Sequence, residues 1–123
     1  MTQVPSGSPV LRVQALQDSL DSYGRVRAGW LFGLIDQAAM LVGEHLTQGA
    51  VAAVSINTFQ LQVPVYLNDT VTLYAECLRK GQSSLVLKVS ALVERSDGNT
   101  VLAAEVIMTY VAVDDQGKSR QIA

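Results

Sequence analysis

Cysteine and histidine are nearly absent from this sequence, since each occurs once in 123 residues. The lone cysteine, Cys77, cannot form an internal disulfide, and together with His45 it cannot supply the ligands of a structural zinc site. We therefore expect no metal. Cys77 lies in a stretch where apolar and polar residues alternate, so we interpret it as a packed core thiol. His45 is interpreted as a packed or helix-capping side chain.

Charged residues are also scarce, at 16% of the chain, whereas hydrophobic residues make up 49%. A small monomer needs more charged residues than this to cover its surface. The composition therefore favours an oligomer that buries part of that surface. The net charge is −2, and lysine and arginine are scattered rather than clustered. This balance predicts no nucleic-acid partner.

No basic-then-apolar leader opens the chain, and no apolar run is long enough to span a membrane. We expect a soluble, cytoplasmic protein that does not contact membranes. The length fits one domain with a hydrophobic core. Residues 1–8 are rich in proline, serine and glycine, which predicts a flexible N-terminal tail before a single domain at 9–123.

The hydrophobic pattern predicts one helix and five strands. Gly49 is expected to stop the helix, and Asp97-Gly98 marks the clearest hairpin turn. The apolar positions change phase near Asn57, which predicts a bulge, and Pro64 ends that strand. The expected helix covers 28–47, residues 17–27 form a loop, and the expected strands cover 9–15, 50–63, 69–80, 83–95 and 100–113.

The helix distinguishes between two ways of combining one helix with an antiparallel sheet. A cystatin-like fold would leave one helix face in water, whereas a hotdog fold wraps a curved sheet around the helix. The helix is apolar or small nearly all round, which favours burial on both sides. The sequence therefore predicts an α+β hotdog fold of about five strands with a dimer partner beside the helix. Its main core stripe is expected to hold Trp30, Leu31, Leu34, Ala38, Leu41 and Val42, with Ile35 at the edge.

Asp36 interrupts the second apolar face of this helix, among Phe32, Gly33, Ala39 and Met40. Burying a carboxylate among such neighbours costs free energy unless it has a partner or a chemical task. Two interpretations stay open. Asp36 is either a solvated or structurally hydrogen-bonded acid, or a general base or nucleophile in a cleft.

Gly29 stands at the predicted helix start, where backbone N–H groups can approach a ligand and the helix dipole favours negative charge. Gly29 and Asp36 lie about two turns apart, roughly 10 Å of rise. An oxyanion held at one helix start and a carboxylate on a partner's helix could then flank one carbonyl. Close packing of the loop explains Gly29 equally well.

Four runs of residues stand out by their order and spacing. The first run carries Gly24, Gly29, Trp30, Leu31, Phe32, Leu34, Asp36 and Ala38. The other three runs are Phe59 to Val65 with Asp69, Lys80 to Ser84, and Tyr110 to Asp114 followed by Gly117 to Arg120. Together they resemble hotdog acyl-CoA thioesterases, both the small bacterial enzymes of broad acyl-CoA range and the phenylacetyl-CoA thioesterases.

The resemblance implies a reaction, hydrolysis of an acyl-CoA to free acid and CoA, with Asp36 as general base or nucleophile. It implies that the Gly29 and Trp30 amides bind the oxyanion. No cofactor is implied, since coenzyme A is part of the substrate. It also implies a homodimer or an assembly of dimers, a tetramer or hexamer, with sites between subunits. The residues expected near CoA are Lys80, Gly81, Ser83, Ser84, Lys118 and Arg120.

Four positions depart from the family pattern, and one of them is Arg25, which stands where an acid or a small residue is common. Asp21 replaces an asparagine and is a second candidate at the catalytic centre, while Arg27 and Ala28 precede Gly29. Arg27 either holds a phosphate or forms a structural salt bridge. These departures favour one alternative, a non-catalytic acyl-CoA-binding protein. A hotdog hydratase or dehydratase is less favoured because His45 lies far along the helix. A cystatin-like inhibitor is disfavoured by the helix and by the lack of paired cysteines.

Overall fold

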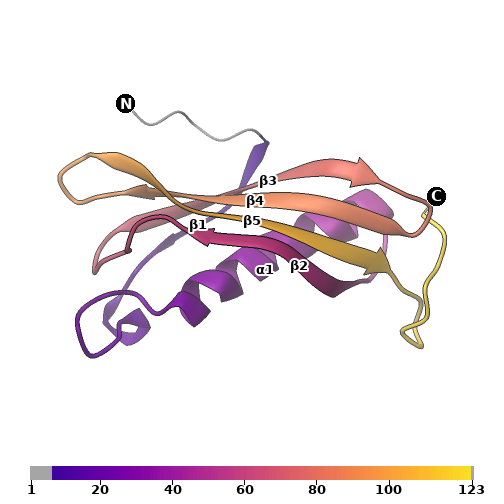
Figure 1. Ribbon diagram of the computed structural model, residues 1–123, viewed down its shortest axis with the longest axis horizontal. Coiled ribbons are helices and arrows are strands. Elements are labelled where there is room, and N and C mark those ends of the chain that lie inside the picture. The colour runs from indigo at the N-terminus through magenta and orange to yellow at the C-terminus, as the bar shows by residue number, and fades with distance from the viewer. Residues whose placement is uncertain (1–6, 123) are drawn as a thin grey trace.

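The structure, a computed structural model, describes residues 7–122 and contains one long helix and five strands (Figure 1). Residues 1–6 of the expected tail lie outside the described residues, and Ser8 already belongs to the first strand. The order of elements and the helix bounds are as predicted. A short 3-10 helix, η1 (Gln17–Ser19), lies in the segment expected to be a loop. The elements are β1 (Ser8–Gln14), α1 (Ala28–Thr47), β2 (Val51–Leu61), β3 (Thr70–Lys80), β4 (Ser84–Glu94) and β5 (Thr100–Ala112).

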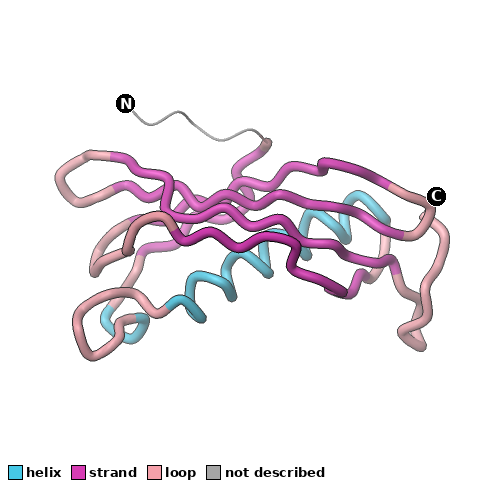
Figure 2. Tube along the Cα trace, in the orientation of Figure 1, coloured by secondary structure: helices cyan, strands magenta, loops and turns pink. Residues whose placement is uncertain are grey.

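The five strands form one antiparallel sheet in the order β1-β3-β4-β5-β2. Helix α1 runs along one face of this sheet and contacts every strand (Figure 2). Strands β1 and β2, which flank α1 in the sequence, form the two edges. The whole sheet therefore supports a single helix, whose middle lies over the central strands.

The buried face of α1 is turned from the stripe that we predicted. The buried helix residues are Leu31, Ile35, Ala38, Ala39, Gly43 and Thr47. Ile35 is thus central rather than at the edge, and Leu41 is 44% exposed. The small residues explain the difference, because a Cβ at Gly43 would lie 3.3 Å from Val51. Gly43 thus lets the helix backbone lie close to Val51 without displacing that side chain.

The predicted bulge in β2 is confirmed at Asn57, where the register with β5 shifts between Ile56 and Thr58. A second shift lies between Ala53 and Ser55. The Asn57 Oδ1 atom accepts hydrogen bonds from Ser55 Oγ at 2.8 Å and Thr109 Oγ1 at 3.2 Å. The bulge thus absorbs the phase change that the sequence shows.

Across that bulge, one face of β2 is apolar yet open to solvent. Ile56, Phe59 and Leu61 pair with Met108, Val106 and Ala104 of β5, which are buried on the helix side. Directly paired residues share a face of the sheet. Ile56 and Leu61 are nevertheless 50% and 51% exposed. Only Phe59 has an aromatic partner on α1, since its ring stacks on Phe32 at 5.2 Å between centroids.

Cys77 is exposed, so the prediction of a packed core thiol is wrong. Strand β1 pairs with β3 only from Thr70 to Ala75. Within the described residues, no strand pairs with the last residues of β3 on that side, and a register shift with β4 follows Cys77. The prediction for His45 is also wrong as regards packing, because that side chain is exposed in the last turn of α1.

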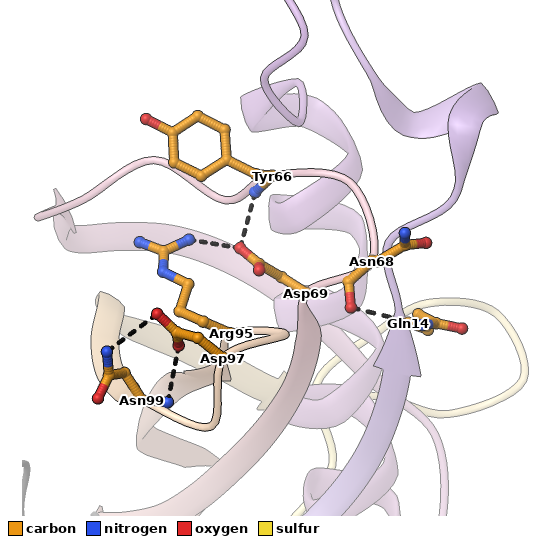
Figure 3. Close-up of polar contacts among 7 residues, drawn as sticks. All are labelled: Gln14, Tyr66, Asn68, Asp69, Arg95, Asp97 and Asn99. Atoms are coloured by element: carbon orange, nitrogen blue, oxygen red, sulfur yellow. Dashed lines mark hydrogen bonds and ion pairs between the residues drawn. The ribbon is translucent and has the colours of Figure 1, made fainter.

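A polar cluster joins the connection before β3 to the β4–β5 hairpin (Figure 3). Asp69 is buried and accepts hydrogen bonds from the Tyr66 amide and from Arg95. The Arg95 guanidinium also lies 5.2 Å from the centre of the Tyr66 ring. The hairpin itself forms where expected, with Gly98 at a φ of 91°. This cluster closes the end of the sheet where α1 begins.

Candidate active site

Asp36 lies near the middle of α1 and is half-buried. Its side chain is hydrogen-bonded to a residue of the sheet in the same chain. The Tyr110 hydroxyl of β5 donates a hydrogen bond of 2.5 Å to Asp36 Oδ1. Within residues 7–122, the second oxygen, Oδ2, carries no hydrogen bond. Asp36 therefore presents one anchored and one available oxygen. This arrangement suits a base or nucleophile.

Tyr110 is fully buried, and its hydroxyl is its only polar side-chain atom. Burial of the phenol, then the hydrogen bond and negative charge of Asp36, raise the pKa of Tyr110 above its ordinary value of 10.0. The hydroxyl thus stays protonated and remains a donor at neutral pH. Our sequence analysis missed this role. The signal was a hydroxyl on the inward face of a strand, which needs a partner when buried.

The start of α1 offers fewer free donors than expected. The Trp30 amide already donates to the Arg27 carbonyl at 3.1 Å. The Gly29 amide has no hydrogen-bond partner among the described residues, and no side chain caps this end of the helix. Of the two amides that the resemblance suggested, only that of Gly29 is therefore free to receive an oxyanion.

Asp21 shapes the loop before the helix. Its Oδ1 accepts hydrogen bonds from the amides of Tyr23 at 2.8 Å and Arg25 at 3.1 Å. The Arg25 and Tyr23 amides, in that order, hold the pKa of Asp21 below its ordinary value of 3.8. An asparagine oxygen could accept the same two hydrogen bonds. The departure from the family pattern therefore preserves the turn but places a charge beside it.

A pocket of about 350 Å³ opens between this loop and the segment that follows β2. Asp21 and Arg25 form part of its polar rim, and Ala28 and Leu31 bring α1 to its wall. The free amide of Gly29 lies in the same helical turn. The remaining lining residues are Val26, Leu61, Gln62, Val63, Pro64 and Val65. The pocket is thus mostly apolar with a charged edge, as expected of a ligand-binding cavity.

The residues that we expected near CoA gather at the opposite end of the molecule. Ser83 accepts a hydrogen bond from the Ala112 amide, and Gln82 accepts one from the Ile122 amide. The Lys80–Ser84 turn and the C-terminal segment that carries Lys118 are therefore neighbours, and both lie beyond the end of β5 (Figure 1). Lys80 and Lys118 are exposed. Because α1 is 20 residues long, about 30 Å separates this region from Gly29.

Two of the predicted arginines have structural contacts instead. Arg27 donates to the carbonyls of Asp18 at 3.1 Å and Leu20 at 3.2 Å, which holds the loop before α1. Arg120 donates to carbonyls and a hydroxyl at the other helix end, including those of Thr47. Every nitrogen of the Arg120 guanidinium thus has a partner within the chain.

Within residues 7–122, no three histidine, cysteine, aspartate or glutamate side chains lie close enough together to hold a metal ion. The described part of the chain also contains no helix that is long and apolar enough to cross a membrane.

Comparison with known proteins gives a consistent result. A family model described as the thioesterase superfamily matches residues 23–102. The chain belongs to the thioesterase superfamily.

Relatives of this superfamily match along nearly the whole chain. The acyl-CoA thioester hydrolase YciA of Escherichia coli is 30% identical, and the match covers 97% of this chain and 93% of YciA. A hexameric thioesterase from Yersinia pestis superposes with a TM-score of 0.94 at 32% identity and 98% coverage of each chain. A hexameric hotdog fold thioesterase of Campylobacter jejuni superposes with a TM-score of 0.89 at 25% identity, covering 95% of this chain and 91% of its own. The predicted hotdog fold is confirmed.

The family match includes both the loop from Tyr23 onward and all of α1. Asp36 and Gly29 thus lie within the segment that matches the thioesterase superfamily model, whereas Tyr110 lies beyond its end.

Proposed function

We propose that this thioesterase-superfamily protein hydrolyses acyl-CoA thioesters to the free acid and coenzyme A. The observation that carries this proposal is the Asp36 carboxylate, half-buried on α1 with Oδ1 held by Tyr110 and Oδ2 available. The YciA relative, named an acyl-CoA thioester hydrolase, supports the reaction class. No cofactor is required, because coenzyme A enters as part of the substrate.

The chemistry requires a nucleophile at the thioester carbonyl carbon and a donor for its oxygen. Asp36 either takes a proton from a water molecule as that water attacks, or attacks the carbon itself. In the first route the C–S bond breaks, the leaving thiolate takes the proton to give coenzyme A, and the acid forms directly. In the second route the C–S bond breaks as Asp36 attacks, so coenzyme A leaves and an anhydride with Asp36 forms, which water then hydrolyses to the free acid and Asp36. The free amide of Gly29 is our candidate for stabilising the oxyanion.

A complete site needs a second copy of this chain. Gly29 lies about two helical turns, roughly 10 Å, before Asp36 on the same helix, which is too far to flank one carbonyl group. A twofold arrangement with antiparallel helices would bring the Gly29 of one copy toward the Asp36 of the other. We therefore propose a homodimer, or a tetramer or hexamer built from dimers, with each site between subunits.

The uncovered face of β2 is the proposed contact surface. Ile56 and Leu61 face the helix side of the sheet but are half exposed, and Met40 and Leu41 on α1 are similarly open. Edge strand β2 also has free backbone groups along one side. A second copy that contacts this surface would bury these exposed apolar side chains. Such burial agrees with the low content of charged residues in the sequence.

The two ends of the molecule suggest how the substrate lies. The apolar pocket beside the start of α1 would receive the acyl group, with Asp21 and Arg25 at its rim. The exposed lysines at the other end, Lys80 and Lys118, would face the phosphates, together with the Gly81, Ser83 and Ser84 turn. In a dimer with antiparallel helices, each site would have the apolar pocket of one subunit on one side and the lysine-bearing end of the other subunit on the other side.

We propose that the enzyme acts in the cytoplasm.

A steady-state panel of acyl-CoA thioesters of increasing chain length tests the function. Release of free thiol, followed with a thiol-reactive dye, should occur with several members of the panel. Calorimetry with coenzyme A should detect binding in the same preparation. Binding without turnover across the whole panel would instead identify a non-catalytic acyl-CoA-binding protein.

A further inference from the structure

The structure places a tyrosine in direct contact with the proposed catalytic carboxylate. Tyr110 lies near the end of β5, and its backbone pairs with Leu85 of β4 and Ala53 of β2. It is fully buried between Met108 and Ala112 on the inward face. A side chain held by two neighbouring strands and a packed core has little freedom to move. Tyr110 is therefore held firmly in place beside the Asp36 carboxylate.

The Tyr110 hydroxyl contacts three atoms. It donates to Asp36 Oδ1 at 2.5 Å, and it lies 3.5 Å from the Asp36 carbonyl and 3.8 Å from Met108 Sδ. A hydroxyl has one proton to donate, and an ionised carboxylate is the strongest acceptor of these three. The short contact with Oδ1 is therefore the one that determines the orientation of the carboxylate.

The protonation of Tyr110 supports a permanent contact. Its burial, and then its hydrogen bond to Asp36 and the negative charge there, raise the pKa of the phenol. The hydroxyl consequently remains a donor throughout the neutral and moderately alkaline range. It cannot accept the proton that a general base takes from water, since it already carries its own. Its contribution must therefore act through Asp36.

We propose that Tyr110 is a positioning residue that fixes Asp36 Oδ1 and so directs Oδ2 at the thioester or its attacking water. This inference rests on the proposed function. Without the hydroxyl, the terminal torsion of the aspartate side chain is broad and two-fold, so the two oxygens would exchange places. With it, one oxygen is anchored to the sheet and the other faces the reaction. Tyr110 thereby assigns different roles to two chemically equivalent oxygens.

The test is Tyr110→Phe, which deletes only the hydroxyl. Tyr74→Phe is the matched control, because Tyr74 is a half-buried strand tyrosine whose hydroxyl has no hydrogen bond among the described residues. Loss of a hydrogen bond to a charged group should lower kcat about 10- to 100-fold. The KM for acyl-CoA should stay within about twofold, since binding is unchanged.

The outcomes separate this inference from the proposed function. A wild-type protein that releases no thiol from any acyl-CoA overturns both. An active wild type with an equally active Tyr110→Phe variant overturns the role of Tyr110 alone. A Tyr110→Phe variant that loses kcat and also has a raised KM for acyl-CoA shows general disruption, which also contradicts positioning.

A second measurement covers the case in which Tyr110→Phe does not fold. Tyrosinate absorbance is followed during alkaline titration of the wild type and of Asp36→Asn, which keeps Tyr110 intact. Asp36→Asn removes the negative charge that helps to raise the pKa of Tyr110. One tyrosine should therefore ionise at lower pH in that variant. Superimposable titration curves would show that the two side chains do not interact and would overturn the inference.

Discussion

Arg120 donates two hydrogen bonds to Thr47, one to its carbonyl at 3.2 Å and one to its Oγ1 at 3.1 Å. The contact joins the C-terminal segment to the last residue of α1. The same guanidinium also donates to the carbonyls of Val113 and Ala50. A cation at this helix end complements the negative end of the helix dipole. Arg120 thus holds the helix, the start of β2 and the end of the chain together.

We predict that Arg120→Ala lowers the free energy of unfolding by about 2 to 3 kcal/mol, because several carbonyls lose a charged donor. Lys118→Ala is the comparison, since Lys118 is exposed and its side chain makes no hydrogen bond or ion pair within the described residues. It should barely alter stability but raise the KM for acyl-CoA at low salt. Urea titration and steady-state kinetics check the pair. Equal stability losses in both variants would contradict the structural role of Arg120.

The ion pair between Asp69 and Arg95 is mostly buried, whereas that between Arg12 and Glu94 is exposed. Removing one partner of a buried pair typically costs about 3 to 5 kcal/mol, and removing one of an exposed pair under about 1 kcal/mol. Because Arg95 keeps some exposure, we expect Asp69→Asn to cost about 2 to 4 kcal/mol. Glu94→Gln should be nearly neutral. Chemical denaturation measures both variants. Equal losses in the free energy of unfolding would contradict the larger contribution of the Asp69–Arg95 pair.

The raised pKa of Tyr110 predicts how stability depends on alkaline pH. The folded state holds the phenolic proton more tightly than the unfolded chain, whose tyrosine titrates near 10.0. The stabilisation is therefore complete below about pH 10 and is lost as pH rises, by at most about 1.4 kcal/mol per pH unit. The stability difference between wild type and Tyr110→Phe should narrow from pH 9 to pH 11. A constant difference in urea midpoints across that range would contradict the shift.

Much of the fold could be predicted because its signals are local. The spacing of apolar residues gave the bounds of α1, and the phase change near Asn57 gave the bulge. The order of the strands could not be predicted this way, since it depends on pairings between distant segments. The same limit explains Cys77, because its exposure depends on which distant segments lie beside the last residues of β3. Nothing near Cys77 in the sequence contains that information.

In the candidate site, too, residues with a local sequence signal could be predicted and residues that depend on distant contacts could not. Asp36 and Gly29 stood out because a carboxylate and a glycine are unusual at those helix positions. Tyr110 did not, because its partner lies 74 residues away in the sequence. Arg120 was expected near CoA because its neighbours resemble the basic tail of related enzymes. Its contacts with Thr47 depend on how the chain end folds back, which no local pattern reveals.

The open face of β2 leads to a prediction about assembly. Ile56→Asp places a charge on the proposed contact surface, whereas Thr58→Asp places the same charge on the opposite face of the same strand. We expect Ile56→Asp to dissociate the assembly, as measured by light scattering, and to abolish activity with it. Thr58→Asp should keep the assembly. An active Ile56→Asp monomer would show that each site lies within one chain.

The most direct test of the central claim is thiol release from acyl-CoA by Asp36→Asn, measured beside Glu44→Gln. Both variants change an acid to its amide on α1, but Glu44 is exposed and makes no hydrogen bond or ion pair through its side chain within the described residues. Loss of the base or nucleophile should lower kcat by about 100-fold or more, a typical contribution of such a group. Glu44→Gln should keep near wild-type activity, and both variants should keep the circular dichroism of the wild type. A folded Asp36→Asn protein with full activity would contradict the assignment of Asp36 as the catalytic carboxylate.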